Sequence, residues 1–307
     1  MQTEPPLDTS NPFTYAEGRA AGISRRRLNG PNFFRVVPGV YVGSEAPLTH
    51  LALIRAALKH APNGVVSGRS AAKLWNAVVP DSADVELMLP RAVRVVARGI
   101  REHRPPTRPP TTWRFGVRVT TPEATFVRLA AELDLVDLVV AGDALVRNAE
   151  ISPADLVAAA TAARTRRSRL ARRAAALVRE GVDSPRESKL RLLMVLAGMP
   201  EPEVNIVFYK EDGSWEFRLD LGRRDKKVAF EYDGRQHETP EHTAYDDWRK
   251  SVLGERDWRV HSFVNADLYV STDLTVQRLR EIHDDLGIPH TPSLEWQRHF
   301  PVRRKVA

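Results

Sequence analysis

Alternating apolar and polar residues in the last third of the chain predict a β-sheet. In residues 215–221 every second position is Trp, Phe or Leu, and the positions between them carry Glu, Arg and Asp. A period of two places the apolar side chains on one face of a strand and the polar ones on the other. Residues 226–233 alternate in the same way. Along the chain the pattern gives a helix from Pro185, strands near 203–209, 215–221 and 226–233, a helix over 241–256, a strand over 258–264 and a helix over 272–286.

Three acidic residues stand at the ends of two of these strands, where acids are uncommon. Asp220, Glu231, Asp233 and His237 lie within 18 residues of one another. Buried carboxylates are costly unless they are paired or bound to a metal. Two acids that converge from neighbouring strands make a site for Mg²⁺, which takes oxygen ligands and keeps several waters. The pattern therefore indicates hydrolysis of a phosphodiester.

The register between the two strands decides whether these acids meet. We expect the loop from Gly222 to Asp225 to join the strands as a hairpin. A flat ladder with Leu221 opposite Lys226 would leave Glu231 roughly 13 Å along the strand from the partner of Asp220. Convergence therefore needs a sharp bend, a bulge or a different register.

The first 45 residues predict a small DNA-binding unit with two short helices and a hairpin. Residues 14–17 (Thr-Tyr-Ala-Glu) form a capping box that opens the first helix, and Ser24 caps a second helix that begins with three arginines. Residues 33–42 follow as a hairpin around Pro38-Gly39. Arginines at the start of a second helix are well placed for phosphates and groove edges. A solvated arginine face is the structural alternative.

The middle of the chain predicts an α+β region without a cluster of acids. Its expected elements are a helix over 48–60, a turn and helix over 65–75, strands over 85–89 and 113–120, and an exposed Pro- and Arg-rich loop over 101–110. Ser67 begins a Ser-Gly-Arg-Ser turn that could cradle an anion, although a simple N-cap is the stronger interpretation. A long basic helix is then expected from Pro153 to Glu180 and ends before Gly181.

Charge is distributed unevenly along the 307 residues. The net charge is +7, with 26 Lys and Arg against 16 Asp and Glu up to residue 181, and 20 against 23 from residue 182. A positive first half suits a protein that holds a polyanion there and an acidic site elsewhere. The chain has no cysteine and no long apolar run, so we expect a cytoplasmic protein without disulfides or a membrane partner. A homo-oligomer is allowed but not indicated.

Residues 183–286 resemble the very-short-patch-repair-like branch of the PD-(D/E)XK nuclease superfamily. The resemblance rests on Asp220 followed by residues 231–237, Glu-Tyr-Asp-Gly-Arg-Gln-His, and on the order of helix, β-meander, helix and strand. It implies a restriction-endonuclease-like αβββαβ domain that uses Mg²⁺ or Mn²⁺ to cut DNA. Two positions depart from the pattern: Leu219 replaces the Pro before the motif Asp, and Asp233 replaces the Lys that helps to activate water. His237 or Lys227 could take that role.

The resemblance also assigns roles to single residues. Asp220 and Glu231 are the expected metal ligands, with the backbone carbonyl of Tyr232 as a third, while Asp233 would bind a second metal or position a water. His237 would move a proton or contact the scissile phosphate. Glu187 would be an acid next to the metal, although Ser184-Pro-Arg-Glu187 is also a capping box.

The N-terminal layout resembles the winged-helix region of AbiEi-type antitoxins, which implies contact with DNA. The expected architecture is an α/β multidomain chain with a winged helix over 1–45, a middle domain over 46–150, a basic connecting helix over 151–181 and a nuclease domain over 182–307. The function expected from it is a metal-dependent DNA endonuclease. A non-catalytic, antitoxin-like DNA-binding repressor with a degenerate nuclease fold, or an RNA nuclease, remain open. The expected DNA contacts are Arg25, Arg26, Arg27, Arg35, Arg166, Arg169, Arg173 and Arg249.

Overall fold

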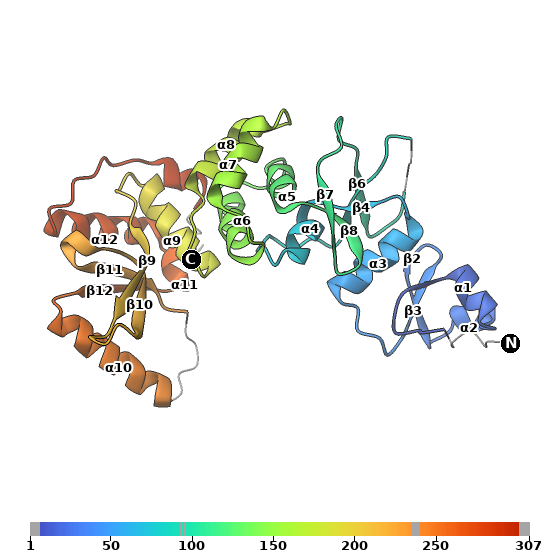
Figure 1. Ribbon diagram of the computed structural model, residues 1–307, viewed down its shortest axis with the longest axis horizontal. Coiled ribbons are helices and arrows are strands. Elements are labelled where there is room, and N and C mark those ends of the chain that lie inside the picture. Colours follow the sequence, from blue (N-terminus) through green and yellow to red (C-terminus); the bar gives the residue numbers. More distant parts are fainter. Residues whose placement is uncertain (1–6, 93, 95, 235–239, 301–307) are drawn as a thin grey trace, which may run out of the picture. The chain divides into compact units, whose positions relative to one another are not determined.

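The chain forms two compact units of mixed α and β structure (Figure 1). The computed structural model describes residues 7–92, 94, 96–234 and 240–300, without the side chains of 240–247. The first unit contains residues 1–133 and 155–171, and the second contains residues 134–154 and 172–307. The finer division at residues 45, 150 and 181 stays a prediction. No helix in the described ranges is long and apolar enough to cross a membrane.

The N-terminal part of the first unit is a three-stranded sheet with two short helices. Its elements are β1 (Phe13–Thr14), α1 (Tyr15–Ala20), α2 (Arg25–Leu28), β2 (Phe33–Val37) and β3 (Val40–Gly43), with strand order β1-β3-β2. The predicted capping box is present: the Thr14 hydroxyl accepts from the Glu17 N–H, and the Glu17 carboxylate accepts from the Thr14 N–H. Ser24 caps α2 as expected. Phe13 and Leu28 form the centre of its core.

A five-stranded sheet with order β6-β5-β4-β8-β7 follows in the same unit. Its elements are α3 (His50–His60), β4 (Val65–Val66), α4 (Gly68–Leu74), β5 (Val85–Met88), β6 (Ile100–His103), β7 (Thr111–Arg114), β8 (Val117–Thr120) and α5 (Pro122–Leu129). Two expectations are wrong here. Residues 113–120 are not one strand, because a two-residue turn at Phe115-Gly116 folds them into a hairpin with residues 111–112. Residues 101–103, expected in a loop, pair with β5.

Ser67 does not hold an external anion at α4. Its side chain makes no cap hydrogen bond and instead lies 3.3 Å from Nε2 of His103. The buried carboxylate of Glu86, on β5, accepts from the Arg69 N–H at the helix N-terminus. The side chain of Glu86 therefore accepts the free N–H at this end of the helix. Ser67 stands at the N-cap position, but its side chain does not cap the helix.

The expected long helix over 153–180 is two helices, α7 (Pro153–Ala162) and α8 (Ser168–Leu177). The Arg164 guanidinium donates to the carbonyl oxygens of Thr161, Ala162 and Ala163, and so caps the end of α7. Arg167 then takes a left-handed φ of 63°. The chain therefore breaks in a sequence with good helix propensity because an arginine side chain satisfies the last carbonyls.

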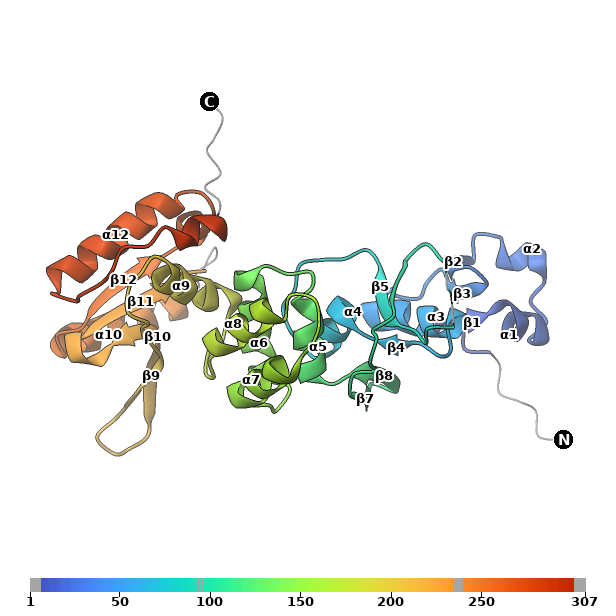
Figure 2. The ribbon, with the colours of Figure 1, turned by 90° about the horizontal axis from the view of Figure 1, so that it is seen from above.

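The second unit is built on a four-stranded sheet with order β12-β11-β10-β9. Its elements are α6 (Leu135–Asn148), α9 (Pro185–Leu196), β9 (Glu203–Tyr209), β10 (Trp215–Arg223), the 3₁₀ turn η1 (Arg224–Lys226), β11 (Val228–Tyr232), α10 (Pro240–Glu255), β12 (Arg259–Phe263), α11 (Asn265–Tyr269), α12 (Thr272–Asp285) and the 3₁₀ turn η2 (Glu295–Arg298). β12 runs parallel to β11, and the other pairs are antiparallel. Helix α10 lies on one side of the sheet, with α9 and α12 on the other (Figures 1 and 2).

The core of this unit confirms part of the alternation in β10. Phe217 and Leu219 pack with Ala229 of β11 and Leu253 of α10. Trp215 does not join them, because the register with β9 shifts between Trp215 and Phe217 and leaves the indole 59% exposed. A β-bulge of this kind changes which side chains face the core.

Candidate acidic site on the four-stranded sheet

The register of β10 and β11 places the two expected metal ligands directly beside the last paired residues of the two strands. Leu221 pairs with Phe230 and Gly222 with Ala229, so the next positions in this register are Asp220 and Glu231. The connection is not the expected loop over 222–225. Strand β10 continues to Arg223, and Lys227 leaves the turn with a left-handed φ of 47°. Of the three solutions foreseen from the sequence, a different register is the one that the chain adopts.

Gly222 makes this close hairpin possible. A Cβ at that position would lie 2.6 Å from the carbonyl oxygen of Val228 and 3.0 Å from the side chain of Ile206. Any larger residue at position 222 would therefore push β10 and β11 apart at the Gly222–Ala229 pair, two positions from Asp220 and Glu231.

Asp220 and Glu231 line a cavity of about 400 Å³ on the α10 side of the sheet. Four further charged residues from β10, β11 and α10 line it with them, namely Arg218, Asp233, Arg249 and Lys250. The carboxylate of Asp220 accepts the backbone N–H of Tyr232. Burial raises the pKa of Asp220, against the opposing effects of this hydrogen bond and of Arg249 and Arg218.

Glu187 approaches the same cluster from the first turn of α9. Its side chain is buried, and its pKa is raised by burial first and then by the negative charge of Asp220. Ser184 caps the helix by accepting the Glu187 N–H at 3.2 Å, as predicted. The carboxylate of Glu187 does not return to the Ser184 N–H, as a capping box requires, but accepts from the Asp183 N–H at 3.1 Å. Glu187, Asp220 and Glu231 together are called the acidic site below.

Two arginines compensate only part of this negative charge. Arg249 forms a half-buried ion pair with Glu231, and Arg218 forms one with Asp183. The ring of Phe217 lies below the Arg249 guanidinium at 6.0 Å. Burial lowers the pKa of Arg249, although the charge of Asp220 opposes this effect. Glu231 therefore has a cationic partner, whereas the negative charge of Asp220 adds to the effect of burial on the pKa of Glu187.

The other expected site residues have different outcomes. Tyr232 and Asp233 line the cavity, and the Asp233 N–H donates to the carbonyl of Phe263 at 2.7 Å. His237 lies outside the described residues. Lys227 cannot replace the missing lysine, because it lies at the opposite end of β11 from Glu231 and its Nζ is 3.2 Å from Asp257. Metal binding by the Tyr232 carbonyl stays a prediction.

Most of the arginines expected to contact DNA are at the surface. Seven of them are exposed: Arg25, Arg26, Arg27, Arg35, Arg166, Arg169 and Arg173. Two have acidic partners, Glu231 for Arg249 and Glu295 for Arg173, and the nearest atoms of the second pair are 2.5 Å apart. These ion pairs could not be predicted from the sequence, because the two residues of each pair are 18 and 122 positions apart. Arg218 was missed as a cavity residue, although it precedes Asp220 by two positions on the same strand.

Within the described ranges, no three His, Cys, Asp or Glu side chains form a metal-binding group. The acidic site contains two carboxyl groups with raised pKa values, those of Glu187 and Asp220, and a third, that of Glu231, which pairs with Arg249. This composition fits a hard cation such as Mg²⁺, which needs only one or two carboxylates.

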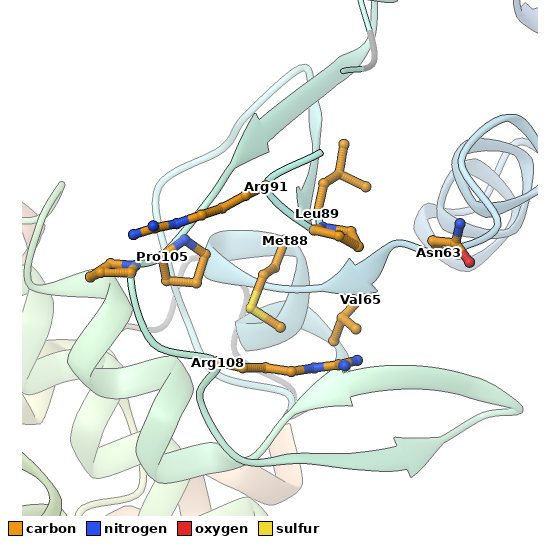
Figure 3. Close-up of a pocket in the computed structure, with 9 residues that line it drawn as sticks. Asn63, Val65, Met88, Leu89, Arg91, Pro105 and Arg108 are labelled. Carbon is orange, nitrogen blue, oxygen red and sulfur yellow. The ribbon is translucent and has the colours of Figure 1, made fainter. Parts of the chain in front are cut away.

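A second cavity, of about 220 Å³, lies on the five-stranded sheet (Figure 3). Its floor is apolar, with Val65, Met88 and Pro105, and Arg91 and Arg108 extend on opposite sides of it. None of the described residues that line this cavity is acidic.

No protein-family model matches the chain, and no curated protein matches it either. The assignment of a function must therefore rest on the residues themselves.

Proposed function

We propose that the protein is a DNA endonuclease that hydrolyses phosphodiester bonds with Mg²⁺ or Mn²⁺ at the acidic site. The observation that supports this most directly is that Asp220 and Glu231 lie beside the last paired residues of β10 and β11 and line one cavity, while the negative charge of Asp220 raises the pKa of Glu187 on α9. Like charges that are close enough to repel favour either a shared proton or a bound cation.

The residues of the cavity, together with Glu187 of α9, would divide the roles in phosphodiester hydrolysis between them. Asp220 and Glu187 would hold the cation, and Glu231 would join them when Arg249 moves from it. A bound Mg²⁺ supplies charge neutralisation and a more acidic water. Lys250 and Arg218 line the same cavity, and cationic side chains there would orient a phosphodiester through its non-bridging oxygens.

The first unit would supply the affinity for DNA. It carries 22 Lys and Arg against 11 Asp and Glu, whereas the second unit carries 24 against 28. A net charge of +11 on one unit attracts a polyanion, and the net −4 of the other does not. The exposed arginines of α2 and β2 belong to this positive unit, in the part proposed to be a winged helix.

A non-catalytic DNA-binding regulator is the second candidate, and the Arg249–Glu231 pair favours it. An arginine in this pair puts positive charge where a metal would otherwise be needed, and Asp233 stands where the resembled family has its lysine. The same fold would then keep its DNA affinity without chemistry.

The deciding experiment is a cleavage assay with Mg²⁺ and Mn²⁺ on supercoiled DNA, linear duplex, single-stranded DNA and RNA. We expect cleavage of DNA by the wild type and its loss in Asp220→Asn. Asp285→Asn is the matched control, because Asp285 is an exposed acid at the end of α12. A wild type that binds DNA but cuts nothing in either metal would favour the regulator, and cleavage of RNA alone would replace the substrate.

A further inference from the structure

The hairpin of β7 and β8 presents two large aromatic side chains to solvent in the first unit. Trp113 is 70% exposed, and Phe115 at the tip is 53% exposed. Trp113 stands directly opposite Arg118 in the strand pairing, so both side chains leave the same face of the hairpin. Residues 111–120 are called the aromatic hairpin below.

The tip of the aromatic hairpin has an unusual backbone for its residue. Phe115 and Gly116 have φ values of 50° and 75°, and Arg114 pairs with Val117 on either side of them. A two-residue loop with two positive φ values strongly favours Asn-Gly, because bulky L residues rarely adopt the left-handed conformation. Phe115 therefore has a strained backbone conformation, and strain of this kind is concentrated at functional residues.

Two arginines, Arg114 and Arg55, contact Phe115 and stabilise the tip of the hairpin in this conformation. The Arg114 guanidinium lies 5.0 Å from the centre of the Phe115 ring and 4.5 Å from that of Trp75, and its Nε donates to the Leu74 carbonyl at 2.6 Å. Arg55 donates to the Phe115 carbonyl at 3.4 Å. The tip is therefore held by polar contacts on its inner side, while much of the ring remains open to solvent.

The charge around the aromatic hairpin indicates what would cover it. From residue 103 to residue 122 the sequence contains four arginines and no acid, and these are Arg104, Arg108, Arg114 and Arg118. An apolar protein partner would not need this charge, and a lipid surface would need a wider apolar face than one indole and one phenyl ring. A planar aromatic beside a guanidinium, within a positive unit, is the combination that stacks nucleobases and tracks their backbone.

We propose that the aromatic hairpin is a stacking platform for the unpaired bases of single-stranded DNA, with Trp113 under a base and Arg118 at the adjacent phosphate. The choice of DNA as the polyanion rests on the proposed function. Phe115 extends the platform at the tip, where its ring can meet the next base. The substrate of the protein would then contain an unpaired stretch rather than a continuous duplex.

The test measures equilibrium binding by fluorescence anisotropy in EDTA, so that it does not depend on cleavage. The probes are a labelled oligothymidine, a duplex of the same length, and an abasic oligomer with the same phosphates. We expect Trp113→Ala to weaken oligothymidine binding about 5- to 150-fold, which is the usual effect of losing one stacked base. Trp113→Phe should restore most of the affinity, and binding of the abasic oligomer should not change. Trp215→Ala is the matched control, because Trp215 is a similarly exposed indole in the other unit.

The variant Phe115→Asn distinguishes a loss of base stacking from a loss of fold stability. Asparagine suits the left-handed position, so this variant should melt at a higher temperature than the wild type while it binds oligothymidine more weakly. The proposal is overturned if Trp113→Ala leaves oligothymidine binding unchanged, or if it weakens the abasic oligomer equally. A change of oligomeric state on sedimentation, without a change in affinity, would instead assign the hairpin to contact between copies of the chain. Loss of cleavage with intact base-dependent binding would reject the nuclease and keep the platform.

Discussion

At the scale of single residues, the acidic site holds more negative charge than its neighbours neutralise. Asp220 and Glu187 are largely buried, each has a raised pKa, and burial is the main cause for both. Arg249 and Arg218 are the nearby cations, but each forms an ion pair with another acid. Ionisation of Asp220 and Glu187 therefore lowers the stability of the folded protein unless a cation binds.

This imbalance predicts how stability depends on pH. The folded-state pKa of Asp220 lies above its unfolded value of about 3.9, so the folded protein binds the proton more tightly. Stability should be greatest below about pH 4 for this group and should fall as pH rises through the raised pKa. We expect Asp220→Asn to melt at a higher temperature than the wild type at neutral pH, with the difference vanishing near pH 4. Differential scanning calorimetry across this range measures it, and an equal effect at both pH values would contradict the assignment.

Arg249 occupies the position that decides between the two candidate functions. If it competes with a cation for Glu231, Arg249→Gln should tighten Mg²⁺ binding several-fold in calorimetric titration, because one positive charge is lost from the cavity. Arg256→Gln is the control, since Arg256 directly follows the same helix and pairs with Glu216 at 2.8 Å. Weaker Mg²⁺ binding in Arg249→Gln alone would mean that the arginine supports the metal site and does not block it.

At the scale of elements, α6 belongs to the second unit through one buried polar network. Arg191 of α9 is fully buried and pairs with Asp143 of α6 at 3.1 Å and with Glu201 at 2.6 Å. Ser188 donates to the same oxygen of the Asp143 carboxylate as Arg191, at 2.7 Å, and the other oxygen accepts the Arg179 N–H at 2.8 Å. Residues 143 and 191 are distant in sequence, so no local pattern could place α6 here.

The network predicts a large loss of stability when one partner is removed. Asp143→Ala would remove the buried partner of the Arg191 charge and leave it the partly exposed Glu201, which should cost up to about 3–5 kcal/mol. Arg173→Ala breaks an exposed pair with Glu295 and should cost less than about 1 kcal/mol. Urea unfolding followed by circular dichroism compares them. The double variant Asp143→Leu with Arg191→Met should recover much of the loss, and a double variant as unstable as Asp143→Ala would show that packing, not the unpaired charge, is responsible.

Sequence patterns located most elements of the second unit and missed the details that chemistry requires. The strands and helices from residue 185 to 285 appear within three residues of their expected bounds, because an alternating or amphipathic pattern is a local property. The register of β10 and β11 was open, since it depends on the left-handed conformation of Lys227 and on the absence of a Cβ at Gly222. The break after α7 was missed because the side chain of Arg164, and not a helix-breaking residue, ends the helix.

At the scale of the whole molecule, charge separates the two units more sharply than the sequence alone indicated. A division at residue 181 gives net charges of +10 and −3, and the spatial units carry +11 and −4. The difference arises because residues 134–154, with four acids and one arginine, and residues 172–181, with three arginines and one acid, both belong to the acidic unit. Truncation at residue 182 would also remove Asp143 from Arg191, so such a fragment would not report the properties of the intact unit.

The positive unit predicts the salt dependence of DNA binding in the full-length chain. Each phosphate contact contributes about 0.9 to the slope of log K against log salt for duplex DNA. Replacing Arg25, Arg26 and Arg27 with Ala should therefore flatten the slope by up to about 2.7 and weaken binding most at low salt. Filter binding of a duplex between low and moderate salt, without divalent metal, measures both quantities.

The matched control for this prediction removes three cations from the acidic unit. Arg223, Arg224 and Lys226 lie together at the turn between β10 and β11, and their replacement with Ala changes the net charge by the same amount. If affinity follows net charge alone, the two triple variants should weaken binding equally. If α2 contacts phosphates, only the Arg25–Arg27 variant should flatten the slope, because counterion release depends on direct neutralisation of phosphates. An unchanged slope in that variant, with a flattened one in the control, would move DNA binding to the acidic unit and leave α2 as a solvated arginine face.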